Sequence, residues 1–161
     1  MKRSKYLVPL SWEHHSALLN ANRLQKGLAN QTPKGILLDF LKYLWENDLS
    51  PHFNREETIV FSVKDWLKVP ESLRNQVLQE HQEMTDLVEQ IEATADENEL
   101  KRLMGMIAQK VIDHVRFEER MLFPQIEKSF STPALEKIEK DLKEAHVPGC
   151  VVWEPKFWEK K

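Results

Sequence analysis

The sequence predicts an all-α chain folded as an up-down antiparallel four-helix bundle, followed by a short fifth helix and an irregular tail. Three observations favour this fold. Apolar residues recur at three- and four-residue steps through four long segments, which is the period of a helix buried on one face. Glycine and proline are scarce, with 4 and 8 among 161 residues, whereas a turn-rich β protein needs many of both. Short connections between the segments make neighbouring helices antiparallel.

The first two predicted helices are separated by a proline-containing turn. The first runs from about Ser11, a plausible N-cap, to about Ala29, and the turn Asn30-Gln31-Thr32-Pro33 ends it. The second runs from that turn to about Leu67. Pro51 lies inside it and removes one backbone hydrogen bond, which predicts a kink or a split at this point.

The third and fourth predicted helices form the second half of the bundle. The third begins after Pro70 and ends before the polar run at residues 95–98. The fourth runs from about Glu99 to about Lys128. Both carry an apolar stripe on the inward face, so the sequence predicts that both pack into the same core as the first two.

A fifth helix and a tail follow the bundle within one predicted domain of residues 1–161. The bundle occupies about residues 10–128, and the C-terminal helix and tail occupy about residues 132–161. The helix extends from Pro133 to about Ala145, with Thr132 as its cap. Three aromatic residues in the tail favour packing onto the bundle over exposure to solvent: Trp153, Phe157 and Trp158.

Composition excludes several classes of protein. The formal charge is −3 and no long basic run occurs, so the chain lacks the electrostatic signature of a nucleic-acid binder. No run of 18 apolar residues occurs, and residues 1–9 lack the apolar region of a secretory signal, which predicts no membrane association and a cytoplasmic location. A single cysteine, Cys150, rules out an internal disulfide framework; we interpret it as structural or incidental.

Metal-capable side chains interrupt the apolar face of each of the four long helices. Six histidines and glutamates fall where an apolar residue is expected: His14, His52, Glu56, His81, His114 and Glu118. Burying unpaired imidazoles and carboxylates costs several kcal/mol each unless something compensates them. The simplest compensation is a cation, so the sequence predicts a metal site in the core.

A repeated motif supports this prediction independently of burial. Residues 52–61 and 114–123 share the pattern H-x3-E-E-x3-F, once on the second helix and once on the fourth. A histidine and a glutamate four residues apart on a helix have Cβ atoms about 5–6 Å apart and can reach the same ion or adjacent ions. Two such pairs related by approximate two-fold symmetry predict two ions bridged by the carboxylates.

This residue pattern resembles the hemerythrin-like, or HHE cation-binding, domain family. The resemblance covers about residues 10–127: one early histidine, H-x3-E, a single histidine, and H-x3-E again. It implies a non-haem di-iron centre with histidines as terminal ligands and two bridging carboxylates. The implied ligands are His14, His52, Glu56, His81, His114 and Glu118. Imidazole and carboxylate ligands suit two iron ions, and also zinc or manganese.

The sequence departs from the oxygen-carrying members of that family at two positions. Those proteins have a further histidine four residues after the one in the third helix, where this chain has Thr85. Their last carboxylate is an aspartate one residue further along, whereas here it is Glu118. The resemblance is therefore closer to the sensing, iron-handling and repair-type branch, and it implies an open position for water, dioxygen or nitric oxide.

Several residues near the predicted ligands leave alternatives open. Either His14 or His15 can point into the core, and His14 continues the apolar stripe of the first helix. Glu57 and Glu119 either face solvent or form a hydrogen bond with a histidine ligand. His146 lies beyond the bundle and is expected at the surface.

The favoured function is a binding protein with a di-iron centre that binds or senses dioxygen, nitric oxide or redox state, or handles iron. The alternative is a di-iron enzyme that acts on peroxide or nitric oxide, or that donates iron for the repair of iron–sulfur clusters. The repair branch usually has an N-terminal segment with a cysteine, and residues 1–9 contain none. A third possibility is a helical interaction module without a metal. The sequence indicates no particular protein partner.

Overall fold

The computed structural model describes residues 4–160, which form helices and connecting segments without any β-strand. The α-helices are α1 (Val8–Ala29), α2 (Lys34–Leu44), α3 (Ser50–Arg55), α4 (Glu71–Ala93), α5 (Glu97–Phe117), α6 (Phe123–Ser129) and α7 (Thr132–Ala145). Three π-helical turns, η1 (Trp45–Leu49), η2 (Glu56–Val60) and η4 (Glu118–Leu122), and one 3-10 turn, η3 (Lys64–Lys68), complete them. The all-α prediction is confirmed for these residues. The predicted domain limits at residues 1–3 and 161 lie outside them.

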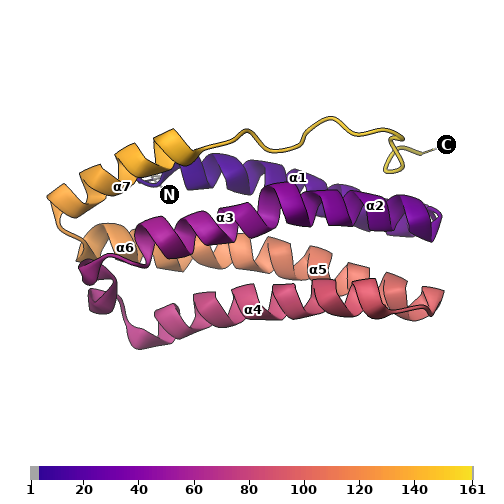
Figure 1. Cartoon of the computed structure of the whole chain (residues 1–161), viewed down its shortest axis with the longest axis horizontal. Helices are drawn as coiled ribbons and strands as arrows, with labels where there is room; N and C mark the ends of the chain where they lie inside the picture. The colour runs from indigo at the N-terminus through magenta and orange to yellow at the C-terminus, as the bar shows by residue number, and fades with distance from the viewer. Residues whose placement is uncertain (1–3, 161) are drawn as a thin grey trace.

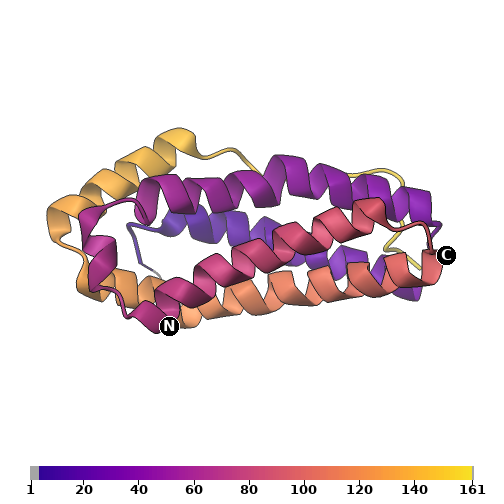
Figure 2. The same cartoon turned by 60° about the horizontal axis from the view of Figure 1, so that its bottom comes forward.

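Four long helical segments lie side by side along the long axis, and successive segments run in opposite directions (Figure 1). They are α1, α2 through η2, α4, and α5 through α6. Helix α5 packs against both α1 and α4, and α7 lies across one end in contact with α1 and η2. Figure 2, turned by 60° about the horizontal axis, brings α4 to the front beside α5. None of the helices within residues 4–160 combines the length and apolar character needed to span a bilayer.

Two predicted helix starts are wrong by a few residues. Helix α1 begins at Val8, and Ser11 is buried inside it instead of capping it. Pro9 lies in the first turn, where its missing N–H has no helical partner to lose. At the start of α7 the capping hydroxyl belongs to Ser131 and not to Thr132: Ser131 Oγ accepts a hydrogen bond from Ala134 N at 3.3 Å.

Pro51 neither splits nor sharply ends its helix. The π-helical turn η1 comes directly before Ser50 and Pro51, and the residues at its junctions keep helical backbone angles. A wider π turn accommodates the missing hydrogen bond and the proline ring. The turn η4 precedes Pro124 in the same way. The second segment nevertheless ends at Val60, earlier than the predicted end at Leu67.

The hydrophobic core is divided into two clusters by a polar layer. One cluster includes Leu24, Phe40 and Ile107, and the other includes Leu10 and Leu122. The predicted metal ligands lie between these clusters along each long helix. Apolar packing therefore encloses these buried polar groups from both ends of the bundle.

The C-terminal tail packs along the bundle, as predicted. The ring of Phe157 contacts Phe40 with a centroid distance of 4.8 Å. Gly27 of α1 leaves the space for it, because a Cβ there would lie 2.5 Å from the Phe157 ring. Trp153 and Trp158 also pack against the larger cluster. In Figure 1 the tail runs beside α1 and α2 toward the end opposite α7.

Candidate metal centre

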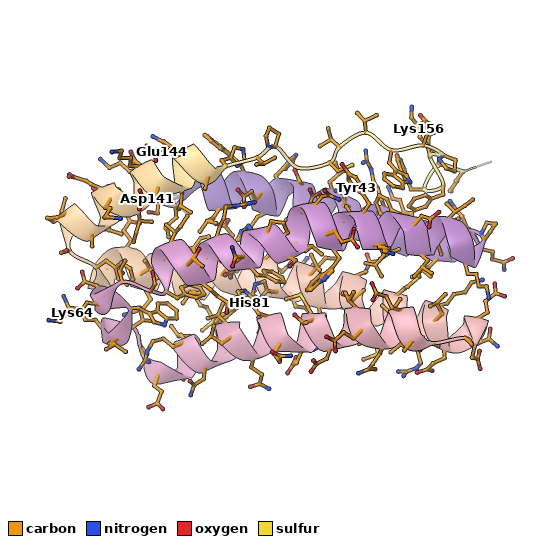
Figure 3. The ribbon with its side chains drawn as sticks, in the orientation of Figure 1. Tyr43, Lys64, His81, Asp141, Glu144 and Lys156 are labelled. Atoms are coloured by element: carbon orange, nitrogen blue, oxygen red, sulfur yellow. The ribbon has the colours of Figure 1, made fainter. Side chains whose placement is uncertain are left out.

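The six predicted ligands converge in the polar layer. Each is at most 5% exposed, and Glu56 and Glu118 are fully buried. They come from α1 (His14), α3 and η2 (His52 and Glu56), α4 (His81), and α5 and η4 (His114 and Glu118). In Figure 3 the labelled His81 lies inside the bundle, between α4 and α3. The structure therefore brings all six side chains together.

Both buried carboxylates occupy the same position in local structure. Glu56 is the first residue of η2 and Glu118 is the first residue of η4. Each H-x3-E pair thus has its histidine in a regular α-helix and its glutamate where the helix widens into a π turn. Such turns often occur at functional sites, and here the two copies of the motif share one backbone geometry.

The ligand atoms form two overlapping sets. One contains His14 and His52, the other contains His81 and His114, and Glu56 and Glu118 belong to both; within each set the atoms lie within 4.8 Å of one another.

Each shared carboxylate contacts one imidazole from each set. Glu56 Oε1 lies 3.3 Å from Nε2 of His52 and 3.3 Å from Nε2 of His81. Glu118 Oε1 lies 2.9 Å from Nε2 of His14 and 3.1 Å from Nε2 of His114. The carboxylates thus lie between the two sets.

A second layer of carboxylates faces the outer nitrogens of the same imidazoles. Glu119 Oε1 lies 2.7 Å from Nδ1 of His14. Glu13 Oε1 lies 2.8 Å from Nδ1 of His52, and Glu80 Oε1 lies 2.8 Å from Nδ1 of His114. The Nδ1 of His81 lies 3.5 Å from Glu57 Oε2. A carboxylate that accepts from Nδ1–H fixes the imidazole tautomer and leaves the lone pair of Nε2 directed inward.

These outer contacts follow the internal symmetry of the bundle. Glu13 on α1 reaches His52 on α3, and Glu80 on α4 reaches His114 on α5. Sequence reasoning missed both of these glutamates. A faint signal was present, because each directly precedes a ligand histidine, as Glu13-His14 and Glu80-His81. The signal does not give the partner, since each glutamate contacts a histidine on another helix.

The open alternatives at three positions now have answers. His14 is buried and His15 is exposed, so His14 is the histidine in the core. Glu119 contacts His14, and Glu57 approaches His81 while remaining 46% exposed.

Two further positions define what surrounds the ligands. The hydroxyl of Thr85 donates to the backbone oxygen of His81 at 2.9 Å, so it is committed to its own helix. The prediction of a surface role for His146 is wrong: its Nδ1 lies 2.9 Å from Glu13 Oε2, and its side chain is 20% exposed.

Within the part of the chain that the structure describes, several inward-facing polar atoms have no hydrogen-bond partner. They are Nε2 of His52, His81 and His114, both oxygens of Glu56, and Oε2 of Glu118. Unpaired polar atoms in a closed core are costly, and a cation that accepts nitrogen and oxygen ligands would compensate these. The donor set therefore fits two metal ions.

Charge in the metal-free site is shared unevenly. Burial raises the pKa of Glu56, and the negative charge of Glu118 raises it further. Burial also acts to raise the pKa of Glu118, but His114 and His14 hold it well below its ordinary value. Two carboxylates this close cannot both ionise easily without a cation between them.

The imidazoles divide in the same way. Burial lowers the pKa of His81 to about 3. Burial also acts to lower the pKa of His114, but Glu118 and Glu80 raise it to about 9. The pKa of His14 is raised as well, because Glu118 and Glu119 outweigh its burial.

The fold and this site define a class of protein: a helical bundle whose core encloses two carboxylates surrounded by four imidazoles. Residues 72–147 match the family model described as the hemerythrin HHE cation binding domain. The match includes His81, His114 and Glu118, and it confirms over that range the family resemblance predicted from the sequence. Comparisons with curated proteins and with solved structures found no significant match.

The metal-free protein is expected to lose stability as pH rises from about 6.5 to about 9. Over this range the folded state retains a proton on His114 that the unfolded chain releases, because the folded pKa of His114 is raised to about 9. The raised pKa values of His14 and Glu56 act in the same direction. The contribution of His114 is fully present below its unfolded pKa and is lost as pH passes through about 9. That group alone gives a limiting slope of about 1.4 kcal/mol per pH unit.

Urea unfolding of chelator-treated protein at several pH values measures this slope. His114→Asn should reduce it, whereas His15→Asn on the exposed face of α1 should leave it unchanged. Stability that increases between these pH values would contradict the charge distribution described above.

Proposed function

We propose that this chain is a non-haem dinuclear metal protein of the hemerythrin type that binds or senses a diatomic ligand, dioxygen or nitric oxide. One observation carries the proposal: each of the two buried carboxylates, Glu56 and Glu118, contacts one imidazole from each ligand set. This is the arrangement expected when two ions share two bridging carboxylates.

Iron is the metal that we propose, with zinc or manganese compatible with the same donors. Two iron ions held by these residues would supply one-electron redox chemistry and an exchangeable position for a small ligand. The protein supplies the orientation of the ligands and the enclosure of the site. Glu13, Glu80 and Glu119 orient the imidazoles through Nδ1, and the two apolar clusters close the polar layer at both ends of the bundle.

An apolar cavity beside the centre favours a diatomic ligand over peroxide. It has room for about one water-sized molecule. Its walls are His14, Ala17, Leu49, His52, Phe53, Met84, Val111, His114 and Val115. The atoms that these walls expose to the cavity are apolar. Peroxide and water require hydrogen-bond partners that such a surface does not supply, whereas dioxygen and nitric oxide do not.

A second apolar cavity adjoins the first and extends away from the centre. The two share Ala17, Leu49 and Val111 as walls, and the second continues past Leu24 and Leu44 between α1, α2 and α5. A small apolar molecule therefore has two neighbouring apolar sites inside the bundle, separated by the shared side chains. We therefore propose that ligands reach the centre along these cavities.

Metal analysis of variants tests the dinuclear assignment. Wild-type protein reconstituted anaerobically with ferrous iron should bind two ions per chain. Glu56→Ala and Glu118→Ala should each lose both ions, because each carboxylate serves both sets. The measurement is elemental analysis after removal of unbound metal.

Two histidines on α1 provide a matched control. His14→Ala should reduce the metal content, and His15→Ala should not, because His15 is exposed. A single-alanine variant of Glu56 or Glu118 that keeps two ions would show that the carboxylates are not bridges. A zinc-only or manganese-only protein would keep the site and overturn the redox role.

Filling the apolar cavity should slow ligand entry without removing metal. Ala17→Leu places extra methyl groups where the two cavities meet. We expect the association rate of nitric oxide with the ferrous protein to fall about tenfold. Stopped-flow absorbance measures the rate, and Leu18→Ala, on the adjacent exposed position, is the control. Unchanged entry in the fully metallated Ala17→Leu variant would exclude this route.

A further inference from the structure

Glu13 differs from the other three outer carboxylates. Its side chain is only 7% exposed, whereas those of Glu80, Glu119 and Glu57 are 24%, 24% and 46% exposed. Those three can exchange hydrogen bonds with solvent at the surface of the bundle. Glu13 is enclosed, so the groups around it fix its position.

Three groups from two distant parts of the chain, α3 and the C-terminal tail, meet at Glu13. Oε1 lies 2.8 Å from Nδ1 of His52 and 2.9 Å from Nη2 of Arg55. Oε2 lies 2.9 Å from Nδ1 of His146, which begins the C-terminal tail. The carboxylate therefore joins a predicted metal ligand on one side to the tail on the other.

The tail is fixed along α1 by a series of specific contacts. We call residues 146–158 the strap. Asn20 and Arg23 donate to the backbone oxygens of Cys150 and Val151 at 2.7 and 2.8 Å, and Cys150 N donates to Asp48 Oδ2 at 3.1 Å.

The strap also lies very close to α1. Gly149 approaches it so closely that a Cβ there would lie 2.5 Å from Ser16. Further along, the Arg23 guanidinium lies 4.1 Å from the ring centroid of Trp158. Figure 3 shows the strap, marked by Lys156, running along the bundle.

The strap also covers a small cavity that borders the predicted ligand His52. The cavity has polar walls from Glu13, Asp48, His52 and Arg55, and Val147 and Gly149 of the strap close it. His52 forms part of the wall of both this cavity and the apolar cavity beside the centre. The strap and the predicted ligand His52 therefore line the same cavity.

We propose that His146 is a positioning residue of the metal centre: it holds Glu13 against His52, so docking of the strap and cation binding at the centre are coupled. This proposal takes one element from the proposed function, namely that His52 binds a cation. A cation on Nε2 polarises the imidazole and strengthens the hydrogen bond from Nδ1–H to Glu13. A fixed Glu13 in turn offers Oε2 to His146, and the effect is reciprocal by linkage.

The single cysteine of the chain lies in the strap and serves as a probe of docking. Iodoacetamide alkylation of Cys150 is measured in metal-free protein and in protein loaded with ferrous iron under anaerobic conditions and freed of excess metal. We expect the loaded protein to react at least about fivefold more slowly. Metal content is measured on the same samples.

Two variants separate coupling from simple packing. His146→Ala removes the contact with Glu13, and Arg23→Ala removes a strap contact distant from it. Both should speed alkylation of the metal-free protein. Only His146→Ala should abolish the difference between loaded and metal-free protein and weaken metal binding about fivefold. His146→Asn, which keeps a donor near the position of Nδ1, should restore part of the difference.

Three outcomes would overturn the proposal. They are equal alkylation rates in loaded and metal-free wild type, the same loss of coupling in both alanine variants, and full coupling in folded His146→Ala protein. In each case a wild-type content of two ions would leave the proposed function intact. Failure to bind metal would overturn both.

Discussion

The structure depends on the burial of two carboxylates in the middle of an apolar bundle. Glu56 and Glu118 are fully buried between two hydrophobic clusters, where an uncompensated charge is strongly unfavourable. Four imidazoles approach the two carboxylates through Nε2. The negative charge is shared unevenly between the carboxylates, because the pKa of Glu56 is raised and that of Glu118 is lowered. Without a cation, several buried polar atoms of this arrangement have no hydrogen-bond partner. With a cation, the same nitrogen and oxygen atoms, from four helical segments, become its ligands.

The surrounding helices are organised around this constraint. Glu56 and Glu118 occupy equivalent positions at the start of the π turns η2 and η4. The outer glutamates Glu13 and Glu80 contact equivalent histidines, His52 and His114, in the two halves of the bundle. The symmetry is broken at Glu13, which is enclosed and contacts the strap, whereas its counterpart Glu80 is half-buried beside an open polar cavity. The two halves therefore offer similar ligands but different access and different connections to the surface.

The sequence alone predicts the inner layer of the site and much less of what supports it. His52 and Glu56, like His114 and Glu118, are placed together by the four-residue spacing of one helix, and the apolar stripe distinguishes His14 from His15. The outer contacts of Glu13 and Glu80 join different helices, so no local pattern contains them. The helix continues through Pro51 because a π turn precedes it. The spacing of apolar residues in the sequence does not reveal such a turn. The sequence places His146 at the surface because it lies beyond the bundle. Its partner, Glu13, is 133 residues away in the chain, so no local pattern predicts their contact.

The most direct test of the central claim is a crystal structure of the iron-loaded protein with anomalous scattering measured at the iron edge. We expect two iron peaks in the polar layer, one beside Nε2 of His14 and His52 and one beside Nε2 of His81 and His114, with the carboxylates of Glu56 and Glu118 between them. A single peak, or peaks confined to surface carboxylates with the six side chains unchanged and unoccupied, would contradict it.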